Sequence, residues 1–379
     1  MFKIKSHLTP HLIAGLFLTG PALISVIFGI LSIPIPATII IYFLAIILII
    51  AQLNFNTLNL KFSKFNLLYI IYLVYFVIAL LSFFEFSQYE ATEFKFITLV
   101  YRIVIPVFFI FFSSILIKNK NKIDVFKIDQ VYFKLWVKAS FVYVIMFYLF
   151  REIQPDGRYI LPGLNNPIWI SRYFGGALVF SIIYYINYNK KINFIIIIYL
   201  TVALLSSGSR GPILAAIITI GLYFYNTRIK YKKLFLLILI SFLIIYFLYY
   251  FSSYLYGDTG YSLVHRFNAL TNALELFNFN GHGLSSFGRL IFNEDSNRYP
   301  HNVFAELIFE FGFIGFVFGF FLCYFVFSSY SYSVIGYLSM YFFINSQVSG
   351  DLVGNALLFT GLVIAWSIKN NKTKFLSNN

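Results

Sequence analysis

Charged side chains are scarce in this 379-residue chain, at 11% of the residues, whereas hydrophobic residues make up 60%. So little polar surface cannot cover a soluble globule of this length, which excludes a soluble protein. Cysteine is nearly absent, because the single Cys323 lies inside an apolar run and has no intrachain partner. A disulfide framework and a cysteine-based zinc cluster are therefore excluded. With a mean hydropathy of +0.82, the composition is typical of a polytopic membrane protein.

Apolar runs of about 17 to 25 residues mark helices that span a membrane. We predict twelve spans, at residues 12–33, 35–52, 65–84, 99–117, 135–150, 172–188, 192–207, 210–226, 233–256, 303–327, 330–346 and 352–368. The fifth is short and the turn between the tenth and eleventh is tight and uncharged, so the alternative count is eleven. We expect one all-α integral membrane domain covering residues 1–379. No short apolar core with a small-residue cleavage site precedes the first span, so we expect no cleaved signal peptide.

Basic residues predict which side of the membrane each loop faces. With a cytoplasmic N-terminus, nineteen of the 28 Lys and Arg residues fall on the inner side, with only two of the 14 acidic residues. This distribution follows the positive-inside rule and places both termini in the cytoplasm. The net charge of +14 is then a topology signal, so it does not indicate binding of nucleic acid.

The two sides also differ in the kind of cation. All but one of the inner cations are lysines, whereas the outer ones, apart from Lys95, are all arginines: Arg102, Arg151, Arg158, Arg172, Arg210, Arg266, Arg289 and Arg298. A guanidinium group matches the paired oxygens of phosphate or carboxylate in a way that an ammonium does not. The outer face is therefore suited to an anionic ligand such as a diphosphate. The alternative is that these arginines balance the outer carboxylates or lie at span ends.

Two outer loops carry the main candidate segments. The loop at 151–171 has the Pro, Gly and Asn content of an irregular segment; it contacts a polar substrate or is an interfacial connector. The loop at 257–302 is the only long polar stretch. Apolar residues recur at helical spacing between His265 and Phe277, which predicts an amphipathic helix on the outer membrane surface that holds Arg266 inward.

Ionisable residues lie at the entrance to the tenth span. His301 precedes Asn302, a candidate N-cap, and Glu306 and Glu310 lie four residues apart on one helix face. Charged groups at this depth are costly and indicate a working site. An imidazole titrates near neutral pH and suits the task of a general base. A structural role is the alternative for a histidine at the membrane interface.

The sequence SGSRGP must turn the chain between the outer ends of the seventh and eighth spans. It brings Arg210 to the start of a helix, where free backbone N–H groups also favour an anion. The competing role for Arg210 is a salt bridge to Glu306, Glu310 or Asp351.

Four segments between residues 200 and 320 carry a family resemblance: SGSRGPILA, HRFNALTNALELF with Arg266 at its start, GHGLSSF, and YPHNVFAELIFEFGFIG. Their order and spacing resemble the O-antigen ligase and O-antigen polymerase (Wzy) superfamily. The resemblance implies a glycosyltransferase at the periplasmic face of the bacterial inner membrane, whose donor is an undecaprenyl-diphosphate-linked oligosaccharide. It implies no metal and no other cofactor. A polymerase joins the donor glycan to a second lipid-linked repeat unit, with a chain-length regulator as a further partner, whereas a ligase transfers it to the lipid A core.

The resemblance also implies residue roles. His301 matches the essential histidine, and we group Glu306 and Glu310 with it as catalytic. The diphosphate-binding arginines match Arg210 and Arg266. Further candidates, by position rather than motif, are Arg158, Arg172 and Arg289. A chain rich in Phe, Ile, Tyr, Asn and Lys favours the polymerase. A flippase or transporter is the rival class, but such proteins place charges near the midplane and often repeat their halves, and neither feature is visible in this sequence.

Overall fold

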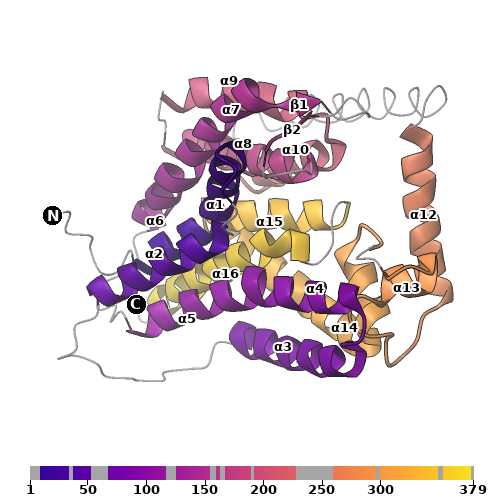
Figure 1. The fold of residues 1–379 in the computed structure, drawn as a ribbon. Coiled ribbons are helices and arrows are strands. Elements are labelled where there is room, and N and C mark those ends of the chain that lie inside the picture. The colour runs from indigo at the N-terminus through magenta and orange to yellow at the C-terminus, as the bar shows by residue number, and fades with distance from the viewer. Residues whose placement is uncertain are drawn as a thin grey trace.

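The computed structural model describes residues 9–33, 37–52, 67–116, 125–153, 159–162, 167–188, 192–227, 259–295, 299–348 and 353–376, and nearly all of them are helical (Figure 1). The helices are α1 (Thr9–Ile30), α2 (Ala37–Gln52), α3 (Leu67–Phe86), α4 (Glu90–Leu99), α5 (Ile105–Leu116), α6 (Val125–Tyr132), α7 (Lys138–Phe150), α8 (Pro167–Tyr188), α9 (Ile192–Ser206), α10 (Arg210–Asn226), α12 (Thr259–Glu275), α13 (Ser286–Phe292), α14 (Val303–Ser329), α15 (Val334–Ser346) and α16 (Ala356–Leu376).

Shorter elements connect these helices. The π-helical segments η3 (Val100–Val104) and η4 (Phe133–Val137) join α4 to α5 and α6 to α7. Single 3-10 turns, η5 (Tyr330–Tyr332) and η6 (Val353–Asn355), precede α15 and α16. In the loop predicted to be irregular, strands β1 (Glu152–Ile153) and β2 (Tyr159–Ile160) form a two-residue antiparallel pair.

The all-helical membrane architecture predicted from the sequence is confirmed in its broad form. Among the described residues, six helices are long and apolar enough to cross a membrane, and four shorter apolar helices accompany them. The predicted count of about twelve spans is not confirmed, and the ninth predicted span, 233–256, lies outside the described residues.

Three helices begin at least five residues earlier than the apolar runs predicted. α4 begins at Glu90 rather than at 99, the α6–η4–α7 rod at Val125 rather than at 135, and α8 at Pro167 rather than at 172. Each added segment contains, or directly precedes, an ionisable residue that is almost fully buried: Lys95, Asp129 and Arg172. A hydropathy scale penalises Lys95 and Asp129 as though they faced lipid, whereas here they face protein, so the prediction cut the first two of these helices short. This reason does not apply to α8, because its predicted span already contained Arg172.

Helix α15 forms the centre of the bundle. Twelve of its thirteen residues are buried, and it packs against α8, α10, α14 and α16. The outer helices instead expose apolar faces, for example Leu81 and Phe84 of α3 and Phe316 and Phe320 of α14. Exposed apolar surface on helices of this length is expected where they contact lipid chains.

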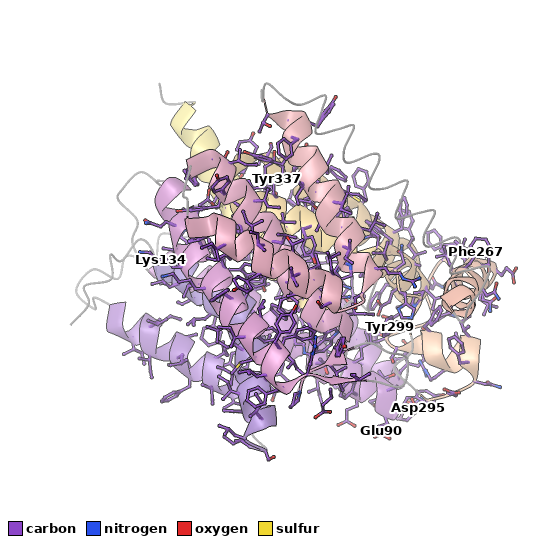
Figure 2. The ribbon with its side chains drawn as sticks, turned by 90° about the horizontal axis from the view of Figure 1, so that it is seen from above. Glu90, Lys134, Phe267, Asp295, Tyr299 and Tyr337 are labelled. Carbon is purple, nitrogen blue, oxygen red and sulfur yellow. The ribbon has the colours of Figure 1, made fainter. Side chains whose placement is uncertain are left out.

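Residues predicted to lie on opposite sides of the membrane are found at opposite ends of the bundle. Figure 1 places α12 and α13 at one end of the bundle, with the end of α16 at the other. Phe267, Tyr299 and Asp295, predicted to be outside, lie at the end opposite to Lys134, predicted to be inside (Figure 2). Hydrogen bonds also join helix ends predicted to share a side, such as Ser171 to Ser207 at 2.7 Å.

Candidate functional site

His301 lies immediately before α14 in a left-handed backbone conformation, with φ of 58°. Few residues other than glycine adopt this region, although histidine does so more readily than most. The half-buried imidazole packs edge-on against Tyr299, with ring centroids 4.7 Å apart. Strained backbone of this kind is concentrated at functional sites, where the surrounding structure holds it in place.

Asn302 fixes the start of α14, as predicted. Its Oδ1 accepts a hydrogen bond from the backbone N–H of Ala305 at 3.0 Å, which caps the helix. Its Nδ2 donates to the carbonyl oxygen of Gln347 at 3.1 Å, next to the end of α15. The residue that follows His301 is therefore anchored on two helices.

Glu306 and Glu310 lie on one face of α14, and both bind Lys95 of α4. The Lys95 Nζ donates to Oε1 of Glu306 and, at 2.5 Å, to Oε1 of Glu310. All three residues are at most 1% exposed. We call this group the Lys95 clamp; it ties α4 to the first turns of α14. From the sequence we predicted a salt bridge to these glutamates as the alternative role of Arg210 and did not predict the contact with Lys95; its only signal in the sequence is that Lys95 is the one lysine among the outer arginines.

The GHGLSSF segment enters a break in α14. Gly312 interrupts the helix with φ of 55° and ψ of −131°. In a regular helix the N–H of Phe313 would donate to the carbonyl oxygen of Phe309. Here it donates to the carbonyl oxygen of Phe279 at 2.8 Å. The carbonyls of Phe309 and Glu310 instead accept from His282 at 3.1 Å and Gly283 at 2.9 Å. Every one of these backbone groups therefore keeps a partner across the break.

Glycine is required where the two backbones meet. A Cβ at Gly281 would lie 2.4 Å from the carbonyl oxygen of Glu310, and one at Gly312 would lie 2.1 Å from that of Phe279. The GHGLSSF segment is also hydrogen-bonded to α3 and α4. The N–H of Leu284 donates to Ser82 Oγ at 2.7 Å, and the Leu284 carbonyl accepts from Thr92 Oγ1 at 3.1 Å. The backbone N–H of Ser285 reaches the Lys95 clamp at Glu310 Oε1, 2.8 Å away.

A cavity of about 840 Å³ opens beside this junction, between α3, α13 and α14. Its lining includes Arg289, Glu85, Glu294, Asp295 and Glu310. The Arg289 guanidinium lies over the ring of Tyr89, 3.8 Å from its centroid. The predicted diphosphate-binding Arg289 thus faces a cavity whose other charged lining residues are acidic, which makes it a poor place for an anion.

The other predicted arginines fall into two groups. Arg210 is the first residue of α10 and is half-buried. Arg172, in the first turns of α8, is 2% exposed and donates from Nη1 to the carbonyl oxygen of Gly354 at 2.5 Å. Arg158 lies outside the described residues, and for Arg266 the structure describes the α12 backbone only.

Helix α12 has one buried face and one exposed face. Ala269 and Ala273 are buried and cluster with Phe287 of α13 and Phe309 of α14. On the other side, Phe267 is 66% exposed. In Figure 1 α12 runs across the direction of the spanning helices, as expected of a helix that lies along a membrane surface.

Taken together, these observations define a helical membrane protein in which a buried group of charges, the Lys95 clamp, lies next to the docked turn that precedes α13. Residues 195–320 of the chain match the family described as O-antigen ligase. The matched segment contains Arg210, α12, α13 and the start of α14 with His301, so the superfamily resemblance predicted from the sequence is confirmed there. The match does not separate polymerase from ligase. No curated protein and no solved structure matches the chain.

Proposed function

We propose that this protein is an O-antigen polymerase, which joins undecaprenyl-diphosphate-linked repeat units at the periplasmic face of the inner membrane. The match of residues 195–320 to the O-antigen ligase family supports the glycosyltransferase part of the proposal, because members of that family are glycosyltransferase-like enzymes. The polymerase part rests on the high content of Phe, Ile, Tyr, Asn and Lys. The predicted catalytic histidine and the predicted arginine turn both fall inside the matched segment.

His301 is the general base of the proposed reaction. A sugar hydroxyl of the acceptor attacks the anomeric carbon of the donor, and the imidazole takes the hydroxyl proton. The bond between that carbon and the diphosphate oxygen breaks, and its electron pair stays on the diphosphate. The left-handed backbone of His301 and the two-helix anchor at Asn302 support this role, because both hold the imidazole in one orientation.

Arg210 and Arg266 bind the donor diphosphate in this proposal. Negative charge grows on the diphosphate as the bond breaks, so fixed guanidinium groups stabilise the transition state more than the ground state. The position of Arg210 at the start of α10 adds free backbone N–H groups, which also favour an anion. Glu306 and Glu310 act indirectly in this scheme, since the Lys95 clamp sets the position of the helix that follows His301.

The proposal is tested by the length distribution of surface lipopolysaccharide. In cells that lack the protein, we expect lipopolysaccharide with a single repeat unit, and we expect the His301→Ala variant to give the same pattern. The His282→Asn variant is the matched control, because His282 lies in the docked turn rather than at the helix entrance; it should restore the full ladder. Equal amounts of each variant in the membrane must be verified by immunoblot.

Two other results would change the assignment. Loss of all repeat units, including the first, would identify a ligase that transfers glycan to the lipid A core, in keeping with the description of the matched family. An unaltered ladder in cells without the protein would rule out both activities and favour a lipid-linked glycan flippase or another transporter.

A further inference from the structure

A second cavity, of about 530 Å³, lies between α1, α2, α4, η3, α8 and the start of α16. Two arginines line it, Arg102 from η3 and Arg172 from α8. We call it the Arg102–Arg172 cavity. None of the described residues that line it is Asp or Glu, so its formal charge is positive, unlike that of the cavity beside Arg289.

Both guanidinium groups are held in place by the protein. The Arg102 guanidinium lies over the indole of Trp169, 4.4 Å from the ring centroid. Arg102 belongs to a π-helical segment, a local distortion that is frequent at functional sites. Arg172 donates from Nη1, one of the nitrogens that carry the five N–H donors of a guanidinium, to the carbonyl oxygen of Gly354. Hydroxyl groups add to the polar part of the lining, from the tyrosines at 42, 101 and 173 and from Ser25, Thr98 and Thr360.

Most of the remaining lining is apolar, and part of it reaches the exposed surface of the helices. Phe17, Pro21 and Leu357 line the cavity, and two further lining residues, Ile39 and Phe94, are 52% and 60% exposed on the surface that meets lipid. A ligand that fits here has an anionic group at the arginines and an apolar chain beside α1 and α2. A lipid phosphate or diphosphate has this form, and it would enter sideways from the membrane.

The lining residues all lie outside the segment that matches the ligase family. They come from residues 17–106, 169–173 and 354–360, whereas the match covers 195–320. The cavity nevertheless adjoins that segment, because Ser171, next to Arg172, donates to Ser207 in the turn that carries Arg210. The start of α8 therefore contributes Arg172 to the cavity and also contacts the turn that carries Arg210.

We propose that the Arg102–Arg172 cavity holds the diphosphate and the first part of the lipid chain of the acceptor substrate. The inference rests on the proposed function, in which both donor and acceptor are lipid diphosphates and the enzyme needs two anion-binding seats. Arg210 and Arg266 form the donor seat. Arg102, which no motif and no comparison assigns, and Arg172 form the acceptor seat.

The number of bound lipids tests this proposal. Purified full-length protein in detergent is mixed with undecaprenyl diphosphate, and native mass spectrometry counts the molecules bound to each chain. We expect two for the unmodified protein, one for the double variant Arg102→Gln with Arg172→Gln, and one for Arg210→Gln. Loss of a charged hydrogen-bond donor from a seat should weaken binding there by at least about tenfold.

Arg151→Gln is the matched control, because Arg151 is a predicted outer arginine that does not line the cavity. Its guanidinium lies over Tyr159, 4.3 Å from the ring centroid, and the variant should still bind two lipids. Arg172 is buried and its loss could unfold the protein, so Arg102→Gln alone, checked by thermal unfolding, is the second variant. It should reduce occupancy of one seat while the melting temperature stays within a few degrees of the unmodified protein.

Three outcomes would overturn the proposal. Two lipids still bound to the double variant would show that the cavity is not a seat, and one bound to the unmodified protein would show that no second seat exists. Displacement of the lipid by excess phosphatidylglycerol would show that the cavity takes ordinary anionic phospholipid. These results are independent of the proposed function, which fails separately if the lipopolysaccharide ladder does not depend on the protein.

Discussion

Substitution of Lys95 should destabilise the protein strongly, because it would leave two carboxylates buried without their shared cation. The side chain of methionine approximates the lysine stem, so Lys95→Met removes mainly the charge. Both Oε1 atoms contact the same nitrogen, so they lie within roughly 5 Å of each other. Two unit charges at that distance repel by about 3 kcal/mol at an effective dielectric constant of about 20.

This value agrees with the general cost of breaking a buried ion pair, about 3–5 kcal/mol. We therefore expect Lys95→Met to lower the free energy of unfolding by about that amount. The measurement is denaturant unfolding of the purified protein in detergent, followed by circular dichroism. Lys134→Met is the matched control: Lys134 is exposed in η4, and its substitution should change stability by less than about 0.5 kcal/mol.

A triple variant separates electrostatics from packing. Lys95→Met combined with Glu306→Gln and Glu310→Gln removes all three charges, and we expect it to recover more than half of the lost stability, because the buried charges no longer lack a counterion. If Lys95→Met has the same free energy of unfolding as the unmodified protein, the Lys95 clamp does not stabilise the fold. If the triple variant is no more stable than the single one, the loss comes from packing and the electrostatic reasoning is wrong.

Two further predictions concern the entrance to α14 and the sidedness of the chain. Asn302→Ala should lower the free energy of unfolding by about 1–2 kcal/mol, since it removes the helix cap. The same variant should shorten the lipopolysaccharide ladder, because His301 loses its anchor. Asn302→Asp keeps the cap acceptor and should recover part of the stability. A stable and fully active Asn302→Ala would contradict this role for the cap. In a Cys323→Ser background, Asn272→Cys on the exposed face of α12 should react with a membrane-impermeant maleimide in intact spheroplasts, whereas Lys134→Cys should react only after permeabilisation. The reverse pattern would place His301 in the cytoplasm and end the proposed function.

Much of the architecture follows from local patterns in the sequence. The scarcity of charge and the long apolar runs determine that the chain is a bundle of membrane helices, because hydrophobic helices are among the few structures stable in lipid. Asn302 predicts its own helix start, since a cap depends only on residues within one turn. The turn at Gly208 and the start of α10 at Arg210 follow in the same way from adjacent small residues and a proline.

The tertiary structure alone decided which buried charges meet. Lys95 lies 211 and 215 residues from its two glutamates in the sequence, and nothing local to either segment indicates that α4 packs beside α14. The docking of Gly281 and Gly283 into the break at Gly312 is equally non-local. The pairing of Arg102 with Arg172 in one cavity depends on how α8 lies against η3. A sequence shows that a charge in a membrane helix needs a partner, but only the packing of the helices supplies that partner.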